Sequence, residues 1–235
     1  DEALLKAEPR IRDKVWYVGP SGGSGVDTRK YNSAARLAGR EDVRQELGVG
    51  PDTLVVGYIG RLAWEKGFRE LIDAAALLNG GGTARDIRYI IIGDGGGAGD
   101  IKAYANERGV GGRFVFLGYR FDVERYMAGM DIFTLPSYRE GISVSLLQAL
   151  AMGLPCIASD IRGNREIMRH KETGLLFPVG DASAYSGAIA GMADNREDAL
   201  ALGARAEKYV SENFAEEALV ENVSGILARL AAERL

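Results

Sequence analysis

The stretch LVVGYIGRLAWEKGFRELIDAAALL, residues 54–78, contains a complete strand, loop and helix. Its first six residues form an almost continuous apolar run, which is typical of a strand buried on both faces of a parallel sheet. A glycine-bounded loop, residues 60–67, follows this run, and apolar positions from Phe68 to Leu78 then recur at helical spacing. A strand that leads into a helix is the first half of a βαβ unit, so this segment predicts an α/β fold.

The same alternation continues along the chain to residue 158. Apolar runs predict strands at Leu54–Ile59, Ile87–Ile92, Phe114–Leu117, Ile132–Leu135 and Cys156–Ala158. Helical spacing predicts helices at Phe68–Leu78, Asp100–Arg108, Val123–Ala128 and Val144–Met152. With about six strand candidates rather than eight, the pattern favours an open, doubly wound parallel sheet with helices on both faces over a closed barrel.

The two ends of the chain depart from this alternation. Residues 1–50 contain the strand candidate Val15–Val18, the turn GPSGGSG and a polar stretch that ends in the helix-like EDVRQELG, and we interpret them as an interdomain or edge segment. Beyond the sheet, helical spacing predicts three consecutive helices at Asp181–Met192, Glu197–Ser211 and Glu216–Leu235, with residues 195–235 forming the C-terminal helices. The last helix carries an apolar stripe made of Leu219, Val223, Ile226, Leu227 and Leu230, which predicts docking on the body of the protein.

The composition is that of a globular protein, and we expect a single domain over residues 1–235. The net charge of −4 and the scattered basic residues indicate no nucleic-acid partner. The single Cys156 and the single His170 exclude a disulfide framework and a cysteine–histidine zinc site within one chain. The longest apolar stretch, residues 146–158, is too short to span a bilayer, and no signal peptide is recognised, so we expect a cytoplasmic location.

The loop Gly60–Gly67 is the first candidate site, because ligands of an open parallel sheet bind at the carboxyl ends of the strands. It carries Arg61 and Lys66, five positions apart, between glycines that let the backbone approach a ligand. An arginine fork and a lysine ammonium together suit a diphosphate. A pair of solvated surface cations is the alternative that this loop alone leaves open.

The second candidate is the loop PSYREGI, residues 136–142, which leads into the predicted helix Val144–Met152. Ser143 is the expected N-cap, and the unpaired N–H groups of the first turn lie at the positive end of the helix dipole, where they form an anion site. Ser145 and Gln148 share the helix face that begins at this end, while the leucines face the sheet. A buried, hydrogen-bonded Gln148 is the alternative.

The turn Gly93–Ala98 matches the dinucleotide-binding pattern Gly-x-Gly-x-x-Ala after a strand. The pattern normally opens the first βαβ unit and precedes an acid about twenty residues later, and neither condition holds here. We therefore interpret these glycines as a tight turn beside a ligand. No lysine of the Walker type and no Asp-x-Asp pair accompanies the glycine loops, so neither a P-loop nor that kind of metal site is predicted.

Taken in order, these loops resemble the donor-binding half of the retaining glycosyltransferases of group 1, family 4, whose GT-B fold has two facing Rossmann-like domains. The resemblance covers roughly residues 25–235. It rests on Gly-Arg-Leu at 60–62, Glu-Lys-Gly at 65–67, and Ser-x-x-Glu-Gly at 137–141 ahead of a leucine-rich helix. It implies the C-terminal, Rossmann-like half of a GT-B enzyme, with the N-terminal acceptor domain absent from this chain.

The resemblance also implies roles for single residues. Arg61 and Lys66 would hold the donor diphosphate in place of a metal ion and help the nucleotide to leave, and Glu140 would contact the transferred sugar; these three are the expected catalytic residues. The donor-binding set adds Gly60, Tyr119, Arg120, Gly141, Ile142, Ser143, Val144, Ser145 and Gln148. In that set Tyr119 and Arg120 would line the base, and the N–H groups of Val144 and Ser145 would meet the phosphates. No cofactor and no metal is expected.

Within this resemblance, Gln148 and the final helix differ from the arrangement in the family. Gln148 occupies the position of the second acid of the family's Glu-x-x-x-x-x-x-x-Glu motif, which usually accepts hydrogen bonds from the ribose. An amide oxygen accepts the same bond without charge, so weaker ribose binding is expected. In the family the final helix packs on the N-terminal domain, so part of the apolar stripe between Leu219 and Leu230 would be exposed in this chain.

The implied function is that of a nucleotide-sugar-binding domain of a retaining glycosyltransferase that transfers a hexosyl residue from an NDP-sugar, with UDP as the expected nucleotide. The setting would be polysaccharide or glycolipid synthesis, and the isolated chain would bind donor without turnover. The expected partners are the nucleotide-sugar and the acceptor domain, with contact at the inner face of the membrane only through the full-length enzyme. A non-catalytic interaction module and a nucleotide-sugar epimerase-like domain remain open, and a nicotinamide dehydrogenase rests only on the glycine turn.

Overall fold

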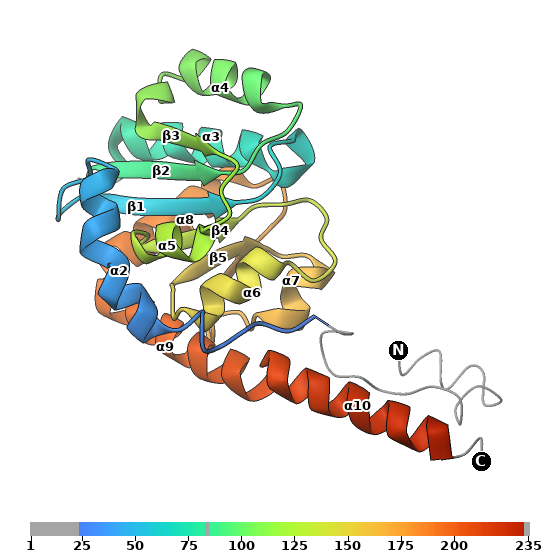
Figure 1. The fold of residues 1–235 in the computed structure, drawn as a ribbon. Helices are drawn as coiled ribbons and strands as arrows, with labels where there is room; N and C mark the ends of the chain where they lie inside the picture. The colour runs from blue at the N-terminus through green and yellow to red at the C-terminus, as the bar shows by residue number, and fades with distance from the viewer. Residues whose placement is uncertain (1–23, 83–84, 233–235) are drawn as a thin grey trace.

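The computed structural model describes residues 24–82 and 85–232 (Figure 1). Six parallel strands form a sheet in the order β3-β2-β1-β4-β5-β6. The strands are β1 (Leu54–Ile59), β2 (Ile87–Ile92), β3 (Phe114–Gly118), β4 (Ile132–Leu135), β5 (Cys156–Ser159) and β6 (Leu175–Phe177). The order reverses between β1 and β4, so the sheet is doubly wound, as the sequence predicts.

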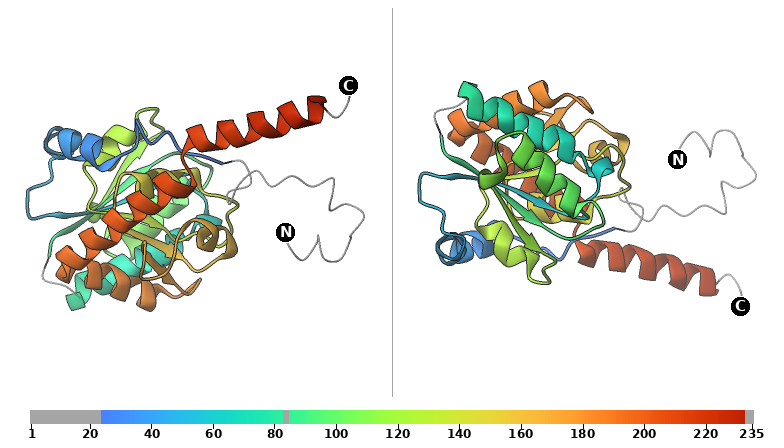
Figure 2. Two further views of the ribbon diagram at one scale, coloured as in Figure 1. Left: turned by 90° about the horizontal axis from the view of Figure 1, so that it is seen from below. Right: turned by 90° about the horizontal axis from the view of Figure 1, so that it is seen from above.

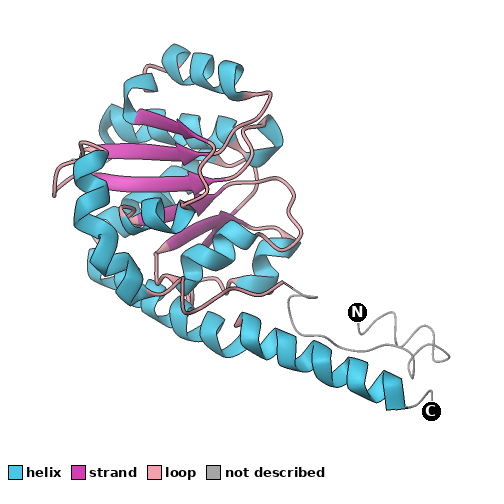
Figure 3. Ribbon diagram, viewed as in Figure 1, coloured by secondary structure: helices cyan, strands magenta, loops and turns pink. Residues whose placement is uncertain are grey.

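The strands form where the apolar runs predict them, because helices cover both faces of the sheet (Figure 3). All residues of β1, β4 and β5 are buried. The pairing of β1 with β2 runs in register from Leu54 beside Ile87 to Ile59 beside Ile92, so both strands end at the same edge. The strand candidate Val15–Val18 lies outside the described residues, and the sixth strand is β6, whose three residues are too few to show a periodicity.

The helices are α2 (Ser33–Glu46), α3 (Phe68–Leu77), α4 (Ala98–Glu107), α5 (Val123–Ala128), α6 (Val144–Ala151), α7 (Arg162–Ile167), α8 (Ala182–Asp194), α9 (Arg196–Asn213) and α10 (Glu216–Ala232). Helix α3 packs on α4 and α8, and α2 packs on α5. Figure 2 shows these two groups on opposite sides of the sheet. The predicted helices are confirmed with shifts of one to a few residues at their ends, whereas α7 is a helix that the sequence pattern does not predict.

Helix α2 packs on α5 and belongs to the folded body, while the interpretation of residues 1–50 as an interdomain or edge segment stays a prediction. It begins at Ser33 because the side chain of Asn32 accepts a hydrogen bond from the N–H of Ala35 at 2.8 Å. The helix is longer than the helix-like segment at residues 41–48. Its buried face includes Arg36 and Arg44, so the contact with the body depends on charged groups and escapes a search for apolar periodicity.

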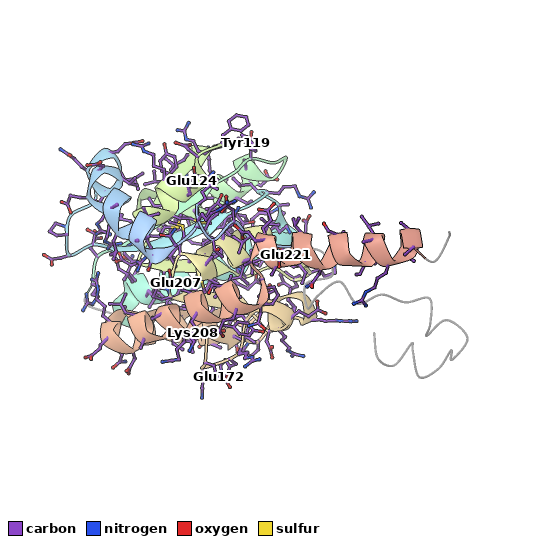
Figure 4. All side chains as sticks on the ribbon, turned by 60° about the horizontal axis from the view of Figure 1, so that its bottom comes forward. Tyr119, Glu124, Glu172, Glu207, Lys208 and Glu221 are labelled. Atoms are coloured by element: carbon purple, nitrogen blue, oxygen red, sulfur yellow. The ribbon has the colours of Figure 1, made fainter. Side chains whose placement is uncertain are left out.

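Helix α10 leaves the body of the protein, and the predicted docking of its apolar stripe is therefore wrong (Figures 1 and 2). None of its residues is buried, and Leu227 is 60% exposed. Its start is held by backbone hydrogen bonds between Val26 and the 214–216 segment, and beyond that point it projects with Glu221 on its surface (Figure 4). The exposed stripe agrees with the alternative that the family resemblance implies.

Within the described part of the chain, the helices are all too short or too polar to cross a lipid bilayer.

Candidate functional site

Four loops meet at the carboxyl edge of the sheet and enclose a cavity of about 680 Å³. They follow β1, β2, β3 and β4, so the cavity spans the point where the strand order reverses. Its lining consists of Tyr58, Ile59, Gly60, Arg61, Lys66, Ile92, Gly93, Asp94, Tyr119, Arg120, Val123, Leu135, Glu140, Ile142, Ser143, Val144, Ser145 and Gln148. The structure thus brings together every site residue predicted from the sequence except Gly141, which does not line the cavity.

The loop after β1 is held in position by Tyr58 and Gly67. The buried hydroxyl of Tyr58 donates to the carbonyl of Arg61 at 3.0 Å, and burial raises the pKa of this hydroxyl, so it remains a donor. Gly67 has φ 78°, and a Cβ at this position would lie 2.1 Å from the carbonyl oxygen of Pro136. Glycine is required here because the loops after β1 and β4 touch through their backbones.

Both cations of the β1 loop are paired with carboxylates. Lys66 Nζ lies 2.7 Å from Glu140 Oε1, and the two side chains are only 18% and 15% exposed. Arg61 Nη2 lies 2.5 Å from Glu65 Oε1 at the rim, where the arginine side chain is 63% exposed. An exposed pair of this kind contributes ~0–1 kcal/mol, so Arg61 can exchange Glu65 for another anion at little cost. The ion pair between Lys66 and Glu140 joins the loops after β1 and β4 inside the cavity.

The N-terminus of α6 faces the same cavity. Ser143 is the N-cap, as predicted, and its hydroxyl accepts a hydrogen bond from the N–H of Leu146 at 3.3 Å. Ser143, Val144 and Ser145 all line the cavity, with Val144 exposed. The positive end of the helix dipole therefore points toward the cations rather than into the core, and an anion in the cavity would interact with both.

Gln148 lies on the cavity face of α6 and is half-buried. Its neighbours Leu146, Leu147 and Leu150 are fully buried in the core. The polar stripe from Ser145 to Gln148 therefore begins at the N-terminus of α6 and faces the cavity, and Gln148 is not buried among the leucines.

The loop after β3 forms an exposed aromatic rim. Tyr119 lines the cavity and contacts the exposed ring of Phe121 edge-on, with 5.0 Å between the ring centroids. Figure 4 shows Tyr119 standing away from the surface. The guanidinium of Arg120 lies over the ring of Tyr126 at 5.7 Å, which directs it along α5 at the side of the cavity.

The glycine turn after β2 is required by close backbone packing. A Cβ on Gly93 would lie 1.9 Å from the carbonyl oxygen of Gly60, and a Cβ on Gly95 would lie 2.5 Å from that of Leu62. The same turn is joined to the β1 loop by the N–H of Leu62, which donates to the carbonyl of Asp94 at 3.0 Å. The predicted tight turn is confirmed, and this packing accounts for glycines that would otherwise suggest dinucleotide binding.

Helix α7 packs against the backbone of the loop that carries Glu140. Gly163 of this helix is buried, and a Cβ there would lie 2.0 Å from the carbonyl oxygen of Gly141 and 2.5 Å from that of Glu140. The backbone of α7 is therefore in direct contact with the backbone of the β4 loop. The sequence does not predict this contact, because Gly163 belongs to no recognised motif and lies far along the chain from Glu140.

Among the charged residues of the lining, three are cationic and two are acidic: Arg61, Lys66, Arg120, Asp94 and Glu140. Asp94 is a lining residue that the sequence analysis does not name as a site residue. It lies in the loop after β2, and ligands of an open parallel sheet bind at the carboxyl ends of the strands, so the same reasoning that selects the β1 and β4 loops applies to it. The cavity is thus mixed in charge, with its cations near the helix N-terminus.

The remaining candidate residues for chemistry lie elsewhere. Cys156 is completely buried in β5, where burial raises the pKa of its thiol, and it behaves as a core residue, as predicted. His170 is exposed in a loop, and its Nδ1 accepts a hydrogen bond from the N–H of Leu176 at 2.9 Å. In residues 24–82 and 85–232, no three His, Cys, Asp or Glu side chains are grouped closely enough to hold a metal ion.

The family is established by a family model. The model described as Glycosyl transferases group 1 matches residues 39–209, which is most of the chain. The chain belongs to the group 1 glycosyltransferase family. The resemblance inferred from the loops around Arg61, Lys66 and Glu140 is therefore confirmed at the level of the family.

A curated relative and a solved structure each match most of the chain. The Escherichia coli protein named UDP-Gal:alpha-D-GlcNAc-diphosphoundecaprenol alpha-1,3-galactosyltransferase is 29% identical over 199 residues, covering 82% of this chain and 51% of that protein. The structure of Anabaena HepE in complex with UDP matches with a TM-score of 0.77 and 25% identity, covering 87% of this chain and 56% of that chain. The chain spans about half the length of the curated relatives it matches.

A further solved structure defines the matching half. The C-terminal domain of a group 1 family glycosyl transferase (LpcC) from Francisella tularensis has the same fold, with a TM-score of 0.71 at 19% identity. The match covers 81% of this chain and 99% of that domain. The group 1 fold described here is therefore one Rossmann-like half of the GT-B architecture, as the sequence predicts.

Proposed function

We propose that this group 1 chain binds a nucleotide-sugar, with UDP as the nucleotide, and supplies the donor-binding half of a retaining glycosyltransferase that transfers a hexosyl residue in polysaccharide or glycolipid synthesis. The observation that carries the proposal is the convergence of Arg61, Lys66, Glu140 and the N-terminus of α6 on one cavity of about 680 Å³ at the strand-order reversal. That volume is suitable for a ligand of nucleotide size.

The proposed diphosphate position lies between the β1 loop and α6. Arg61, Lys66 and the N–H groups of Val144 and Ser145 would all act on the same phosphate oxygens. When the sugar leaves, the bond between its anomeric carbon and the β-phosphate oxygen breaks, and the electron pair stays on the diphosphate. The cations and the helix terminus stabilise the charge that develops there, a role for which no metal ion is proposed.

Lys66 can serve the diphosphate without losing Glu140. Its ammonium group has three donors, and one of them is directed at Glu140 Oε1 at 2.7 Å. In the proposed complex the other donors reach the diphosphate, while the second oxygen of Glu140 accepts a hydrogen bond from a hydroxyl of the sugar. Gln148, farther along α6, would accept the hydrogen bond of a ribose hydroxyl, and Tyr119 with Arg120 would line the base.

The names of relatives support the nucleotide and the type of sugar. The Escherichia coli relative is named for the transfer of galactose, which is a hexose, from UDP-Gal to a diphosphoundecaprenol-linked acceptor. HepE of Anabaena has been crystallised with UDP and with UDP-glucose. Because this chain spans about half of these proteins, we propose that it binds donor but does not turn it over alone.

A titration of the chain with UDP tests the proposal. Amide resonances of residues 60–66, 140–145 and Gln148 should shift in two-dimensional NMR spectra, and Lys66→Met should weaken UDP binding by roughly 10- to 100-fold, the range expected for one charge-assisted hydrogen bond. Lys102→Met is the matched control, because Lys102 lies on α4 over the ring of Phe116 and outside the cavity lining. Absence of any response to UDP, GDP and ADP would refute the proposed function.

A further inference from the structure

A second cavity lies at the amino ends of the strands, opposite the carboxyl ends that carry the donor cavity. It encloses about 140 Å³ where β1 and β4 begin, and its walls include α2 and α9. The two cavities are separated by the length of a strand, which is about 20 Å for six residues. This second cavity therefore cannot be an extension of the proposed donor site.

Asp131, at the start of β4, is surrounded by arginines. Its Oδ1 accepts hydrogen bonds from Arg40 at 2.5 Å and from Arg196 at 3.3 Å, and its Oδ2 accepts from Arg44 at 3.0 Å. The N–H of Val55 also donates to Oδ2, at 2.9 Å. Two donors on each oxygen fill the acceptor capacity of this carboxylate, so it has no position left for a further cation.

Arg36 lies one helical turn before Arg40 on α2 and lines the same cavity. Its side chain is buried, with the residue only 7% exposed, and its Nε has no hydrogen-bond partner. Within the described residues it forms no ion pair. Burial lowers the pKa of Arg36, and the nearby charge of Arg40 acts in the same direction. Asp131 and Glu207 attract it from a distance. The oxygens of Asp131 are already filled by other donors, and Glu207 accepts from the N–H of Ser33 and does not line the cavity.

A buried guanidinium without a hydrogen-bonded anion is unfavourable, because its desolvation is only partly compensated. We propose that this cavity binds a phosphate group, held by Arg36 with Arg40 and Arg196 at its sides. Planar guanidinium groups match phosphate oxygens in pairs, and the cavity volume suits one tetrahedral anion rather than a nucleotide.

The mouth of the cavity indicates two sources for the phosphate group. Leu37 and Leu200 line the cavity and are both exposed, so an apolar rim lies beside the arginines. A phosphate group enters either as a soluble ion or phosphomonoester, or as the headgroup of an anionic lipid whose acyl chains contact the leucines. The recognising chemistry is the same in both cases, and the experiment separates them.

Thermal unfolding of the chain in sodium phosphate tests the site, with sodium chloride at equal ionic strength as the reference. At a phosphate concentration ten times Kd, the midpoint should rise by roughly 3–5 °C relative to chloride. Arg36→Met should abolish this rise. Arg196→Met, which replaces a half-exposed side chain at the rim and leaves the core intact, should reduce it at least threefold.

Two controls separate this site from other cationic positions. Arg88→Met and Lys102→Met each remove a cation that lies outside both cavities, and both variants should keep the phosphate-dependent rise. An equal rise in chloride and phosphate would overturn the proposal, as would a rise that survives in both Arg36→Met and Arg196→Met.

Sedimentation with lipid vesicles identifies the source. Pelleting with phosphatidylglycerol vesicles, but not with phosphatidylcholine vesicles, that is lost in Arg36→Met and Arg196→Met would assign the site to a lipid headgroup. A phosphate-dependent rise in the unfolding midpoint without pelleting would assign it to a soluble phosphate ligand. Absence of both effects in the unmodified chain would refute the site altogether.

Discussion

Gly163→Ala should displace the loop of Glu140 without removing any polar group. The added Cβ would lie 2.0 Å from the carbonyl oxygen of Gly141, whereas ordinary contact begins at 3.4 Å, so the two backbones must separate by about 1.4 Å. Because Glu140 Oε1 lies 2.7 Å from Lys66 Nζ, a movement of that size breaks or reorients the ion pair. The loop would then present its carboxylate to the cavity in a different position.

The energetic terms have opposite signs. Alanine is favoured over glycine within a helix by about 1 kcal/mol, while overpacking at a buried position costs about 1–3 kcal/mol. A net destabilisation of about 1 kcal/mol is expected, which lowers the unfolding midpoint by roughly 2–4 °C for a chain of this size. Binding of UDP-glucose should weaken at least about tenfold, since a charged hydrogen bond is worth roughly 1.5–3 kcal/mol. UDP itself should bind at least as tightly as before, because it lacks the sugar that Glu140 is proposed to contact and because Lys66 is released from its ion pair.

Thermal unfolding and isothermal titration calorimetry with UDP and UDP-glucose measure these effects. Gly187→Ala is the matched control, because Gly187 lies within α8 and a Cβ there meets nothing within 4 Å. That variant should be unchanged in binding and up to about 1 kcal/mol more stable. If Gly163→Ala resembled Gly187→Ala in stability and kept its affinity for UDP-glucose, the claim that α7 positions Glu140 would be refuted.

Three further predictions concern the cavity and the core. Glu140→Gln frees Lys66 from its ion pair, so UDP should bind about fivefold more tightly while the advantage of UDP-glucose over UDP disappears in calorimetry; weaker UDP binding would contradict this competition. If Gln148 contacts the ribose 2′-hydroxyl, Gln148→Glu should strengthen binding of UDP about fivefold but leave 2′-deoxy-UDP unchanged, and equal gains for both ligands would exclude a contact with the 2′-hydroxyl. Cys156, whose thiol pKa is raised by burial, should react with a thiol reagent at pH 8 only as fast as the protein unfolds, so rapid labelling of the native chain would disprove its burial.

Much of the fold follows from local patterns in the sequence. The strands β1, β2 and β4 have the predicted bounds because each is an almost continuous apolar run, interrupted in β2 only by Arg88, that helices cover on both sides. Strand β6 and helix α7 are not predicted: β6 is an isolated run of three residues, and α7 contains a single apolar residue, Ile167, so it shows no helical spacing. These short elements take their conformation from the neighbours on which they pack.

Helices α2 and α10 show why an apolar stripe is an incomplete guide to packing. Helix α2 buries a single apolar side chain, Val43, beside Arg36 and Arg44. Arg44 is paired with Asp131, just before β4, a contact that no local pattern contains. Helix α10 has the stripe but no buried residue. Whether an amphipathic helix docks depends on a complementary surface elsewhere in the structure, and the helix sequence does not encode that surface.

The members of the candidate site were more predictable than their contacts. Parallel strands end at one edge, so the loops carrying Lys66 and Glu140 had to approach each other once the sheet was inferred. The 2.7 Å ion pair between these residues, 74 positions apart, depends on the separation of the loops. That separation is set by the close contact between the backbones of Gly67 and Pro136, and no local sequence pattern specifies this contact.

The backbone contacts of Gly67, Gly93 and Gly163 also bear on how this site can be redesigned. Each lets one loop or helix rest directly on the main chain of another, at Pro136, Gly60 and Gly141 respectively. A loop transplanted from a relative would therefore fit only together with the segment on which it rests. Changes of donor preference are more readily made by exchanging side chains at the rim, such as Tyr119 and Val144, than by grafting single loops.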